Sequence, residues 1–437
     1  MDYKEKDEIC IIGMGYVGLT LAVAMAKKGF IIHGVEIDKE KLKLIKKGVS
    51  YFYEVGLESA LKNAINKGNL TFSKEIPSRP YSVYIITVGT PINKDTKIPR
   101  FDMIKRVSKE IANVMDKNSL IILRSTVAVK TCRDIVLPIL KQKVKFPQIA
   151  FCSERTVEGK AFEEITKLPQ VIGAINEDTL RRASSIFHKI TPTVVEVSSL
   201  ETAEIIKLLD NVYRDTQFAL ANEIASICEI FKINGYEAIC SANLGYNRTN
   251  IALPGYVGGP CLEKDTYILN YSLKDYKYTP NIAMYARSLN ERLPGKIADQ
   301  ILKWTLDNNL DPKQVKVTLL GMAFKGIPET DDLRGAPSII MIDELIKRGY
   351  KNIFGQDYLI SDEDIKKLKI NPADIMESFN NTNIVIFMNN NPLYKKINLN
   401  QLIKRMSKPA YFVDSWNMFD YEDITSDKVY YRSIGRD

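Results

Sequence analysis

The sequence predicts an α/β protein with two Rossmann-like, doubly wound parallel-sheet domains joined by a long central helix and a helical middle domain. Three observations predict this fold class. A glycine-rich turn follows the first apolar, strand-like run, and further apolar runs follow along the first 200 residues. A similar alternation begins again after residue 314. Between the two patterns, residues 201–231 contain neither Gly nor Pro, which is typical of one long helix. We therefore expect domains at 1–200, 201–305 and 306–437.

Length and composition agree with several folded domains. The chain has 437 residues, of which 45% are hydrophobic, and its formal charge of +8 is spread along helical stretches. Because no basic stripe alternates with aromatic residues, we expect no nucleic-acid partner. No apolar run approaches the roughly 20 residues of a spanning helix, and the charged N-terminus does not resemble a signal peptide. We expect a cytoplasmic protein without membrane contact.

The cysteines and histidines of the sequence restrict which metal sites and which acid–base residues we expect. The six cysteines contain no CxxC pair, which is typical of reduced thiols, and the two histidines lie in no metal-ligand spacing. We therefore expect no metal site, and any acid or base must be Asp, Glu, Lys or Cys.

The first element pair has the layout of a dinucleotide site. A strand over 8–12 leads into GMGYVG (13–18), an amphipathic run over 19–28 follows, and Glu36 ends the next strand, 23 residues after Gly13. Gly13 permits the tight turn, Gly15 the approach of a pyrophosphate, and Gly18 close packing of helix on strand. A carboxylate at position 36 favours NAD over NADP, because it accepts hydrogen bonds from ribose hydroxyls and repels a 2′-phosphate. The alternative is a glycine turn without a ligand.

Polar residues follow the next predicted strands, at 81–91, 119–127, 148–155 and 193–197. Functional groups of parallel sheets gather at the carboxyl ends of the strands. The residues at these ends are Thr90, Pro91, Ser125, Thr126, Glu154 and Arg155.

The long helix and the second α/β pattern contain fewer polar residues that are candidates for a functional site. Lys207 and Asn211 lie four residues apart, hence on one helical face, among apolar residues. A lysine in this setting either extends its ammonium to solvent or acts in catalysis. After a helical stretch over 282–304, strands are expected at 315–324, 352–357, 383–388 and 410–416, with a helix at 338–349.

Cys261 lies in an unusual segment, GYVGGPCLEKD (255–265), between glycines and a charged step. This segment, together with GMGYVGLTLA, TVGTP, STV, SERTVEGKA, AEIIKLLDNVYRDTQFALANEIA and MAFKGIPETDDLRGAPS, resembles the nucleotide-sugar 6-dehydrogenases. That family comprises UDP-glucose, UDP-N-acetylhexosamine and GDP-mannose dehydrogenases. The resemblance implies NAD-dependent, two-step oxidation of the sugar's C6 alcohol to a carboxylate, by a homodimer or a higher oligomer of dimers whose interface is the long helix.

The resemblance also implies roles for six catalytic residues. Cys261 forms a thiohemiacetal with the aldehyde, a second hydride leaves, and water cleaves the resulting thioester. Lys207 and Asn211 stabilise charge on the C6 oxygen. Asp265 and Glu154 serve the proton transfers, and Thr126 positions the water.

The implied contacts with the two ligands cover both α/β patterns. The cofactor positions are Gly13, Gly15, Tyr16, Val17, Gly18, Glu36, Lys41, Thr90, Pro91, Ser125, Thr126 and Arg334. The UDP-sugar positions are Glu154, Arg155, Lys207, Asn211, Arg248, Tyr256, Gly258 and Lys325, with Arg248 reaching the partner's site.

Three positions depart from the family pattern. Lys130 stands where glycine is common, Glu263 where proline is common, and Trp416 where an arginine is often found. The motifs conflict over the sugar, because GPCLEKD is similar to the glucose and GDP-mannose enzymes and NRTNIALPG to the N-acetylhexosamine enzymes. We favour a UDP-N-acetylhexosamine (UDP-GlcNAc or UDP-ManNAc), with UDP-glucose as the alternative. The other rivals are a single-step hydroxyacid-type dehydrogenase and a non-catalytic nucleotide-sugar sensor.

Overall fold

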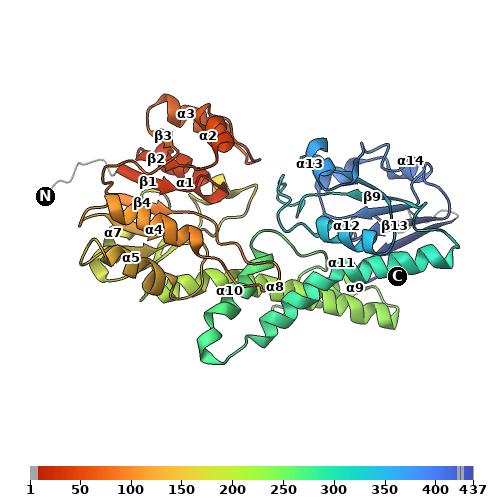
Figure 1. Cartoon of the computed structure of the whole chain (residues 1–437). Helices are drawn as coiled ribbons and strands as arrows, with labels where there is room; N and C mark the ends of the chain where they lie inside the picture. The colour runs from red at the N-terminus through yellow and green to blue at the C-terminus, as the bar shows by residue number, and fades with distance from the viewer. Residues whose placement is uncertain (1–7, 421–423, 425–427, 437) are drawn as a thin grey trace. The chain divides into compact units, whose positions relative to one another are not determined.

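The computed structural model of the chain describes residues 8–420, 424 and 428–436 (Figure 1). The chain forms two compact units. The first comprises Met1–Asp210 and Lys264–Thr279, and the second comprises Asn211–Glu263 and Pro280–Asp437. Both are α/β units built on a sheet, which confirms the predicted fold class.

The first unit contains, within the described residues, an eight-stranded sheet in the order β3-β2-β1-β4-β5-β6-β7-β8. Neighbouring strands are parallel except β6 and β7, which pair antiparallel. The sheet is parallel as predicted except at the β6–β7 pair, in a region where β7 had no predicted counterpart. The strands are β1 (Glu8–Ile12), β2 (Ile31–Val35), β3 (Leu70–Ser73), β4 (Val83–Ile86), β5 (Leu120–Leu123), β6 (Gln148–Phe151), β7 (Gln170–Ala174) and β8 (Val194–Glu196).

Helices cover the first sheet. All residues of the central strands β4 and β5 are buried, as expected of parallel strands enclosed between layers of helices. Helices α1, α3 and α7 share one apolar cluster with the sheet, and α4 packs on α5. The helices are α1 (Tyr16–Lys27), α2 (Lys39–Lys46), α3 (Leu57–Asn66), α4 (Asp102–Val114), η1 (Cys132–Val136), α5 (Leu137–Lys141), α6 (Ala161–Glu164), α7 (Glu177–His188) and η2 (Lys274–Tyr276).

The second unit contains a sheet in the order β11-β10-β9-β12-β13-β14, in which every neighbouring pair is parallel. One apolar cluster joins this sheet to α11 and α12. A second apolar cluster includes α14. Successive side chains of a strand point to opposite faces of the sheet, so the strand residues of the two clusters alternate along the chain. The strands are β9 (Lys316–Leu320), β10 (Asn352–Gln356), β11 (Asn371–Pro372), β12 (Ile384–Phe387), β13 (Ala410–Asp414) and β14 (Val429–Ser433). Strand β14 has no counterpart among the predicted strands.

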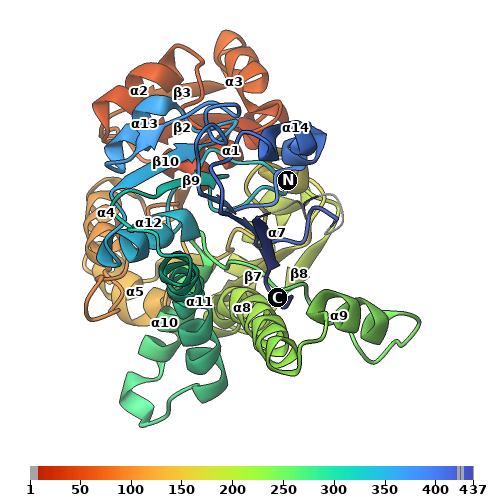
Figure 2. The ribbon, with the colours of Figure 1, turned by 90° about the vertical axis from the view of Figure 1, so that its right-hand side faces the viewer.

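Long helices lead into and along the second unit. The predicted helix over 201–231 is confirmed as α8 (Leu200–Phe231), and the stretch predicted over 282–304 is part of α11 (Asn281–Asp307). In Figure 2, α9 (Gly235–Asn243) and the loop after it extend away from the end of α8. The remaining helices are α10 (Leu262–Ser272), α12 (Pro337–Lys347), α13 (Asp362–Lys367), η3 (Pro392–Lys396) and α14 (Leu399–Ile403).

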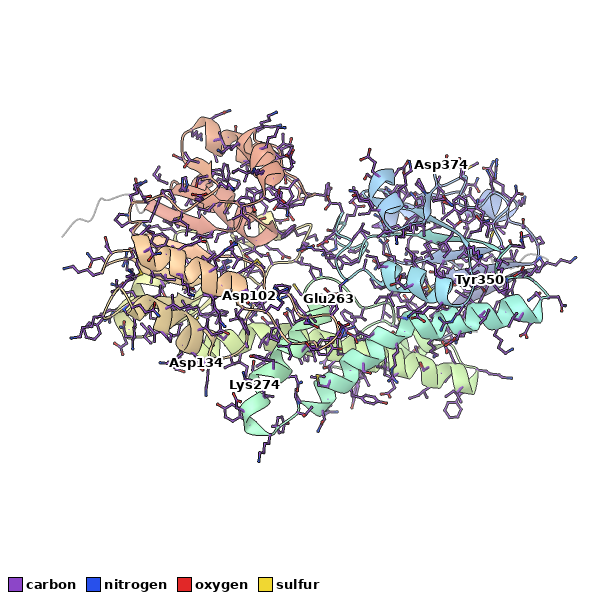
Figure 3. All side chains as sticks on the ribbon, in the orientation of Figure 1. Asp102, Asp134, Glu263, Lys274, Tyr350 and Asp374 are labelled. Carbon is purple, nitrogen blue, oxygen red and sulfur yellow. The ribbon has the colours of Figure 1, made fainter. Side chains whose placement is uncertain are left out.

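A buried hydrogen bond joins α11 to Tyr350, three residues after the end of α12. The hydroxyls of Thr305 and Tyr350 lie 2.6 Å apart, and Tyr350 is labelled in Figure 3. None of the helices in the described part of the chain is long and apolar enough to cross a membrane.

Candidate functional site

The turn between β1 and α1 is shaped to receive an anion. Gly13 donates its N–H to the Val35 carbonyl at 2.9 Å, which closes the turn against β2. A Cβ added at Gly18 would lie 1.8 Å from the Gly13 carbonyl oxygen, so only glycine lets α1 begin this close to the turn. A Cβ added at Gly15 would meet no protein atom within 4 Å. The first N–H groups of α1, which include that of Val17, have no partner within the helix and can bind phosphate.

Glu36 is fixed at the end of β2. Its carboxylate accepts hydrogen bonds from the N–H of Met14 at 3.1 Å and of Asp38 at 2.9 Å, and the residue is buried. Glu36 lines a cavity of about 850 Å³ in the first unit. Gly13, Gly15 and Lys41, which the sequence analysis assigned to the cofactor, also line the cavity, together with residues that it missed, among them Lys74, Thr87, Val88 and Arg106. An open anion cradle, a carboxylate at the end of the second strand and a cavity of this size fit NAD.

The side chain of Tyr16 points away from the turn, although its backbone begins α1. Its hydroxyl donates to Glu54 and accepts the N–H of Gly159 at 2.7 Å. Glu54 is buried and also accepts the N–H groups of Gly159 at 2.9 Å and Phe162 at 3.1 Å. Tyr16 and Glu54 thus tie the loop after β6 to α1. No sequence motif marks Glu54.

The carboxyl ends of β4 and β5 come together in the first unit. Thr90 donates its hydroxyl to the Thr126 carbonyl at 2.5 Å, and Ser125 donates to the Val88 carbonyl at 2.6 Å. The carbonyl of Pro91 accepts the N–H of Arg100 at 2.8 Å. The polar residues predicted at these two strand ends are therefore neighbours.

Glu154 lies beside a buried arginine that the sequence analysis missed. Arg124 donates to the Glu154 carboxylate at 2.7 Å, and the N–H groups of Arg155 and Thr156 donate to its other oxygen at 2.8 and 3.0 Å. Burial by itself would raise the pKa of Glu154. The charge and hydrogen bond of Arg124, together with the two backbone N–H groups, outweigh burial and lower that pKa below its usual value. Glu154 is therefore a carboxylate at neutral pH and can accept a proton.

Three further predicted residues of the first unit lie in or next to long helices. Arg155 forms an ion pair with Asp210 of α8, with Nε and Oδ2 2.8 Å apart. Lys207 of α8 is 8% exposed, so it does not extend into solvent as a surface lysine would. Asp265 in α10 is buried, and its carboxylate lies 3.4 Å from the ammonium of Lys264.

The glycine loop around Cys261 packs against the segment after β9 in the second unit. Gly259 donates its N–H to the Gly335 carbonyl at 2.8 Å and has φ +97°. A Cβ there would lie 2.6 Å from the Phe324 ring, so this position requires glycine both for its conformation and for the close approach. Cys261 is exposed and directly precedes the first residue of α10.

This packing brings several predicted residues of the second unit to one region. Gly258 lies against Gly335 and Pro337, and the neighbouring Arg334 forms an ion pair with Asp332 at 2.6 Å. The Lys325 ammonium lies 5.2 Å from the centre of the Phe324 ring. Lys325, Gly258 and Arg334 therefore belong to the two segments that meet at this loop.

The other predicted residues of the second unit have different surroundings. Asn211 of α8 is buried, and Tyr256 lies in the apolar cluster between α11 and the sheet. Arg248 is exposed, with Nη1 3.4 Å from the Tyr246 hydroxyl. Trp416 packs on Gly255, where an added Cβ would lie 2.6 Å from the indole. Glu263, labelled in Figure 3, places its carboxylate beside Gly335.

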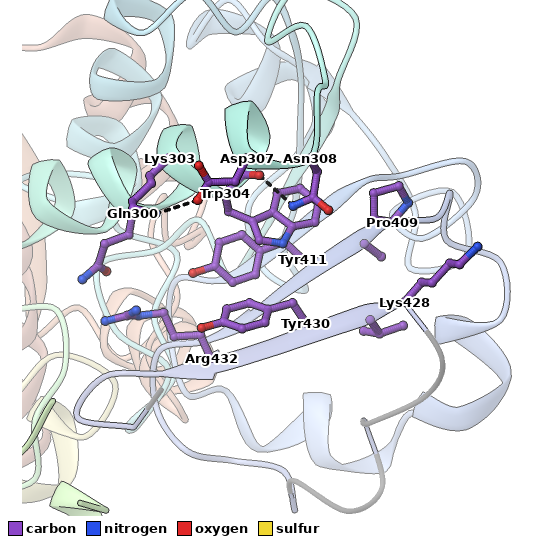
Figure 4. Close-up of a pocket in the computed structure, with 12 residues that line it drawn as sticks. Gln300, Lys303, Trp304, Asp307, Asn308, Pro409, Tyr411, Lys428, Tyr430 and Arg432 are labelled. Carbon is purple, nitrogen blue, oxygen red and sulfur yellow. Dashed lines mark hydrogen bonds and ion pairs between the residues drawn. The ribbon is translucent and has the colours of Figure 1, made fainter. Parts of the chain in front are cut away.

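The second unit has another cavity, of about 640 Å³, lined by α11, β13 and β14 (Figure 4). Trp304 and Tyr430 pack on Tyr411, with ring centres 5.0 and 5.1 Å from it, and Lys303 pairs with Asp307 at 2.6 Å. None of the predicted site residues lines this cavity. Across the described ranges, no group of three or more His, Cys, Asp or Glu side chains is placed to hold a metal ion.

Comparison with known proteins identifies similar chains over nearly the whole length. A UDP-N-acetyl-D-mannosamine dehydrogenase from Pyrococcus horikoshii is 29% identical over 436 residues, 98% of this chain and 99% of that protein. One from Methanococcus aeolicus is 31% identical over 424 residues, 96% and 93% of the two chains.

Solved structures also resemble this chain over nearly its whole length. The UDP-D-ManNAc dehydrogenase structure from P. horikoshii superposes with a TM-score of 0.88 at 27% identity, covering 98% of this chain and 99% of that one. A UDP-N-acetyl-mannosamine dehydrogenase from Staphylococcus aureus superposes with a TM-score of 0.83 at 25% identity, covering 98% of both chains.

Three models of one family match successive parts of the chain. They are the NAD binding domain at residues 7–191, the central domain at 201–292 and the UDP binding domain at 318–421 of the UDP-glucose/GDP-mannose dehydrogenase family. The NAD-binding match coincides with the glycine turn and its cavity. The chain therefore belongs to the UDP-glucose/GDP-mannose dehydrogenase family, a family of NAD-binding enzymes.

Proposed function

We propose that this enzyme oxidises the C6 hydroxyl of a UDP-N-acetylhexosamine, UDP-ManNAc or UDP-GlcNAc, to the uronic acid in two steps. The observation that carries the proposal is that relatives matching the chain from end to end are UDP-N-acetyl-D-mannosamine dehydrogenases. UDP-glucose remains the alternative substrate. When bound, NAD accepts one hydride in each of the two oxidations.

The chain's own residues supply the rest of the chemistry. Lys207 takes the proton of the C6 alcohol and, with Asn211, stabilises charge on that oxygen. The Cys261 thiolate adds to the aldehyde carbon, and oxidation of this thiohemiacetal gives a thioester. Water activated by Glu154 attacks the thioester and releases the carboxylate and the thiol. Asp265 carries protons during these steps.

Local features support these roles. The Arg124 cation and two N–H groups, in opposition to burial, lower the pKa of Glu154 and keep it a carboxylate, the form that can accept a proton. Lys207 and Asp265 are buried, and Cys261 precedes the first turn of α10, where a helix dipole favours a thiolate. Thr126, joined to Thr90 at the end of β5, positions the water.

We assign the ligand contacts by family resemblance. NAD contacts Gly13, Gly15, Tyr16, Val17, Gly18, Glu36, Lys41, Thr90, Pro91, Ser125, Thr126 and Arg334. The UDP-sugar contacts Glu154, Arg155, Lys207, Asn211, Arg248, Tyr256, Gly258 and Lys325. The cavity beside Glu36 supports the first set, and the meeting of the glycine loop with the segment after β9 supports the second. We retain domains at 1–200, 201–305 and 306–437 as part of the proposal.

The decisive experiment counts NADH against sugar. We expect two NADH for each UDP-sugar consumed and a uronic acid as product, tested with UDP-ManNAc, UDP-GlcNAc, UDP-GalNAc, UDP-glucose and GDP-mannose. Cys261→Ser should abolish acid formation and leave NAD binding unchanged, because the thiol acts in chemistry and not in holding the cofactor. One NADH per sugar would indicate a single-step dehydrogenase. Binding without turnover on every sugar would indicate a nucleotide-sugar sensor.

We propose that the enzyme is a homodimer, or an assembly of dimers, formed through α8. Tyr213, Leu220 and Ile227 are spaced by seven residues on this helix and are 63%, 51% and 47% exposed. Leu220 also lines a largely apolar cavity of about 830 Å³ between α8 and α11, near the exposed Ile282 and Tyr285. An apolar stripe of this period is typical of helices that pair.

We also propose a cytoplasmic location. None of the six cysteines, all of which lie within the described residues, forms a disulfide, which supports a reducing compartment.

A further inference from the structure

We propose that Arg287 and Asn222 are positioning residues that hold the loop carrying Cys261 in its reactive geometry. This inference rests on the proposed function, in which Cys261 is the nucleophile. Asn222 lies on α8 and Arg287 on α11, and each is 1% exposed. Each hydrogen-bonds the backbone of the glycine loop, all within the second unit.

Asn222 fixes the start of the loop. Its Nδ2 donates to the Gly255 carbonyl at 3.0 Å, and its Oδ1 accepts the Gly255 N–H at 2.9 Å. The side-chain amide therefore pairs with Gly255 as a neighbouring peptide group would. Both polar groups of this buried backbone position are satisfied, which removes their freedom to rotate.

Arg287 holds the loop on both sides of the thiol. Its Nη1 donates to the Leu262 carbonyl at 2.9 Å, and its Nη2 donates to the Val257 carbonyl at 3.3 Å. Val257 lies four residues before Cys261, and Leu262 directly follows it. The planar guanidinium presents donors in fixed directions, so one side chain sets the separation of the two carbonyls.

Asp215 and Asn290 keep this arginine in place. Nη1 of Arg287 lies 3.0 Å from Oδ1 of Asp215, and Asn290 Nδ2 donates to the same oxygen at 2.8 Å. Asn290 Oδ1 in turn accepts from Asn222 Nδ2 at 3.1 Å. The two loop anchors are thus members of one buried polar network between α8 and α11.

This network is costly, which indicates a purpose beyond joining two helices. Burying an ion pair costs free energy that apolar side chains of similar volume would not, so packing alone does not require it. The loop that it anchors contains glycines at 255, 258 and 259 and is intrinsically loose. A nucleophile must be held within roughly 0.5 Å of its productive position. The network supplies the constraint that the glycines lack.

Arg287→Lys tests whether residue 287 positions the loop, while keeping the positive charge that balances Asp215. An ammonium can pair with Asp215, but it cannot hold two carbonyls as a guanidinium does. We expect kcat for acid formation to fall about 10- to 100-fold, with the KM of the UDP-sugar changing by less than about threefold. The matched control is Arg292→Lys on the same helix, since Arg292 is exposed and bonds the Ser288 carbonyl at 3.2 Å. Its kinetics should equal those of the unmodified enzyme.

The alkylation rate of Cys261 reports whether the loop holds the thiol in place, independently of the catalytic reaction. Cys240 of α9 is also exposed and provides an internal reference, and iodoacetamide labelling of both thiols is followed by peptide mass spectrometry. Cys261 stays covalently joined to the first residue of α10, but a released loop lets its thiol take up several orientations at the helix N-terminus, which lowers its average reactivity. The Cys261/Cys240 rate ratio should fall about threefold or more in Arg287→Lys and Asn222→Ala and stay constant in Arg292→Lys.

The outcomes separate this inference from the proposed function. An unchanged rate ratio in Arg287→Lys and Asn222→Ala overturns the positioning role, even where activity falls. If Cys261→Ser retains full acid formation, the proposed function fails, while the labelling still decides whether the two residues hold the loop. Thermal unfolding and NAD binding verify the fold of each variant, and Asn222→Ala decides the question if Arg287→Lys does not fold.

Discussion

Arg124 sets the charge of Glu154, and its replacement should move the pH dependence of the reaction. Arg124→Met leaves the Glu154 carboxylate buried without its cation, so the pKa of Glu154 rises. Because Glu154 is the proposed base, the acidic limb of the kcat–pH profile should move to higher pH. Urea unfolding should show a loss of about 3–5 kcal/mol, the usual cost of breaking a buried pair.

Arg124→Lys is the control for this change, because it retains a cation beside Glu154. Its acidic limb should lie closer to that of the unmodified enzyme than the limb of Arg124→Met does. An acidic limb that stays in place in Arg124→Met would exclude Glu154 as the titrating base.

Glu204 should make folding stability depend on pH. It is fully buried in α8, and burial raises its pKa to about 7 despite hydrogen bonds from the N–H groups of Cys132 and Lys130. In the unfolded chain a glutamate titrates near 4.3. The native state therefore binds more protons than the unfolded state between these values, and this group's contribution to the free energy of unfolding falls as pH rises through them.

Glu204→Gln removes this titration and isolates its effect. As pH rises from 5 to 8, the free energy of unfolding of Glu204→Gln should increase by about 1–3 kcal/mol relative to that of the unmodified protein. Urea titration of both proteins at the two pH values measures this change. Parallel curves for the two proteins over that range would show that Glu204 is ionised at both pH values.

At the scale of the elements, two glycines of the turn before α1 should respond differently to the same methyl group. In Gly18→Ala the new Cβ meets the Gly13 carbonyl, so α1 must shift, and both NAD binding and thermal stability should be lost. In Gly15→Ala the methyl meets no protein atom within 4 Å, and stability should change by less than about 0.5 kcal/mol. NAD affinity should still fall about tenfold, because the methyl occupies the space of the pyrophosphate.

Isothermal titration with NAD and a thermal unfolding curve for each variant measure these two effects. Gly15→Ala that binds NAD as tightly as the unmodified enzyme would contradict a pyrophosphate lying against residue 15.

At the scale of the whole molecule, the exposed stripe on α8 should govern assembly. Leu220→Lys places a charge in the middle of that stripe, and burying it in an interface without a partner costs free energy. Sedimentation equilibrium should show a dimer for the unmodified chain and a monomer for Leu220→Lys. Leu306→Lys is the matched control, since Leu306 is 56% exposed near the end of α11 and should leave the mass unchanged. A dimer that persists in Leu220→Lys would place the interface elsewhere.

Much of both units could be predicted from sequence, because the signals are local. The turn before α1 combines a strand, spaced glycines and a carboxylate within about 30 residues, and α8 has no Gly or Pro to interrupt it. Strands β3, β7, β11 and β14 were missed. The antiparallel direction of β7 depends on pairing with β6, a contact between distant residues that the sequence of either strand does not encode.

By itself, the sequence determined the fold class, the cofactor turn and the segment that carries Cys261, because each depends on residues close together in the chain. Only the tertiary structure showed Arg124 beside Glu154, Glu54 on Tyr16, and the anchoring of the glycine loop by Asn222 and Arg287. These partners are 30 to 38 residues apart in sequence, or 25 for Arg287 and Leu262. No propensity or periodicity links such positions, since buried polar groups find their partners only when the helices and strands that carry them have packed.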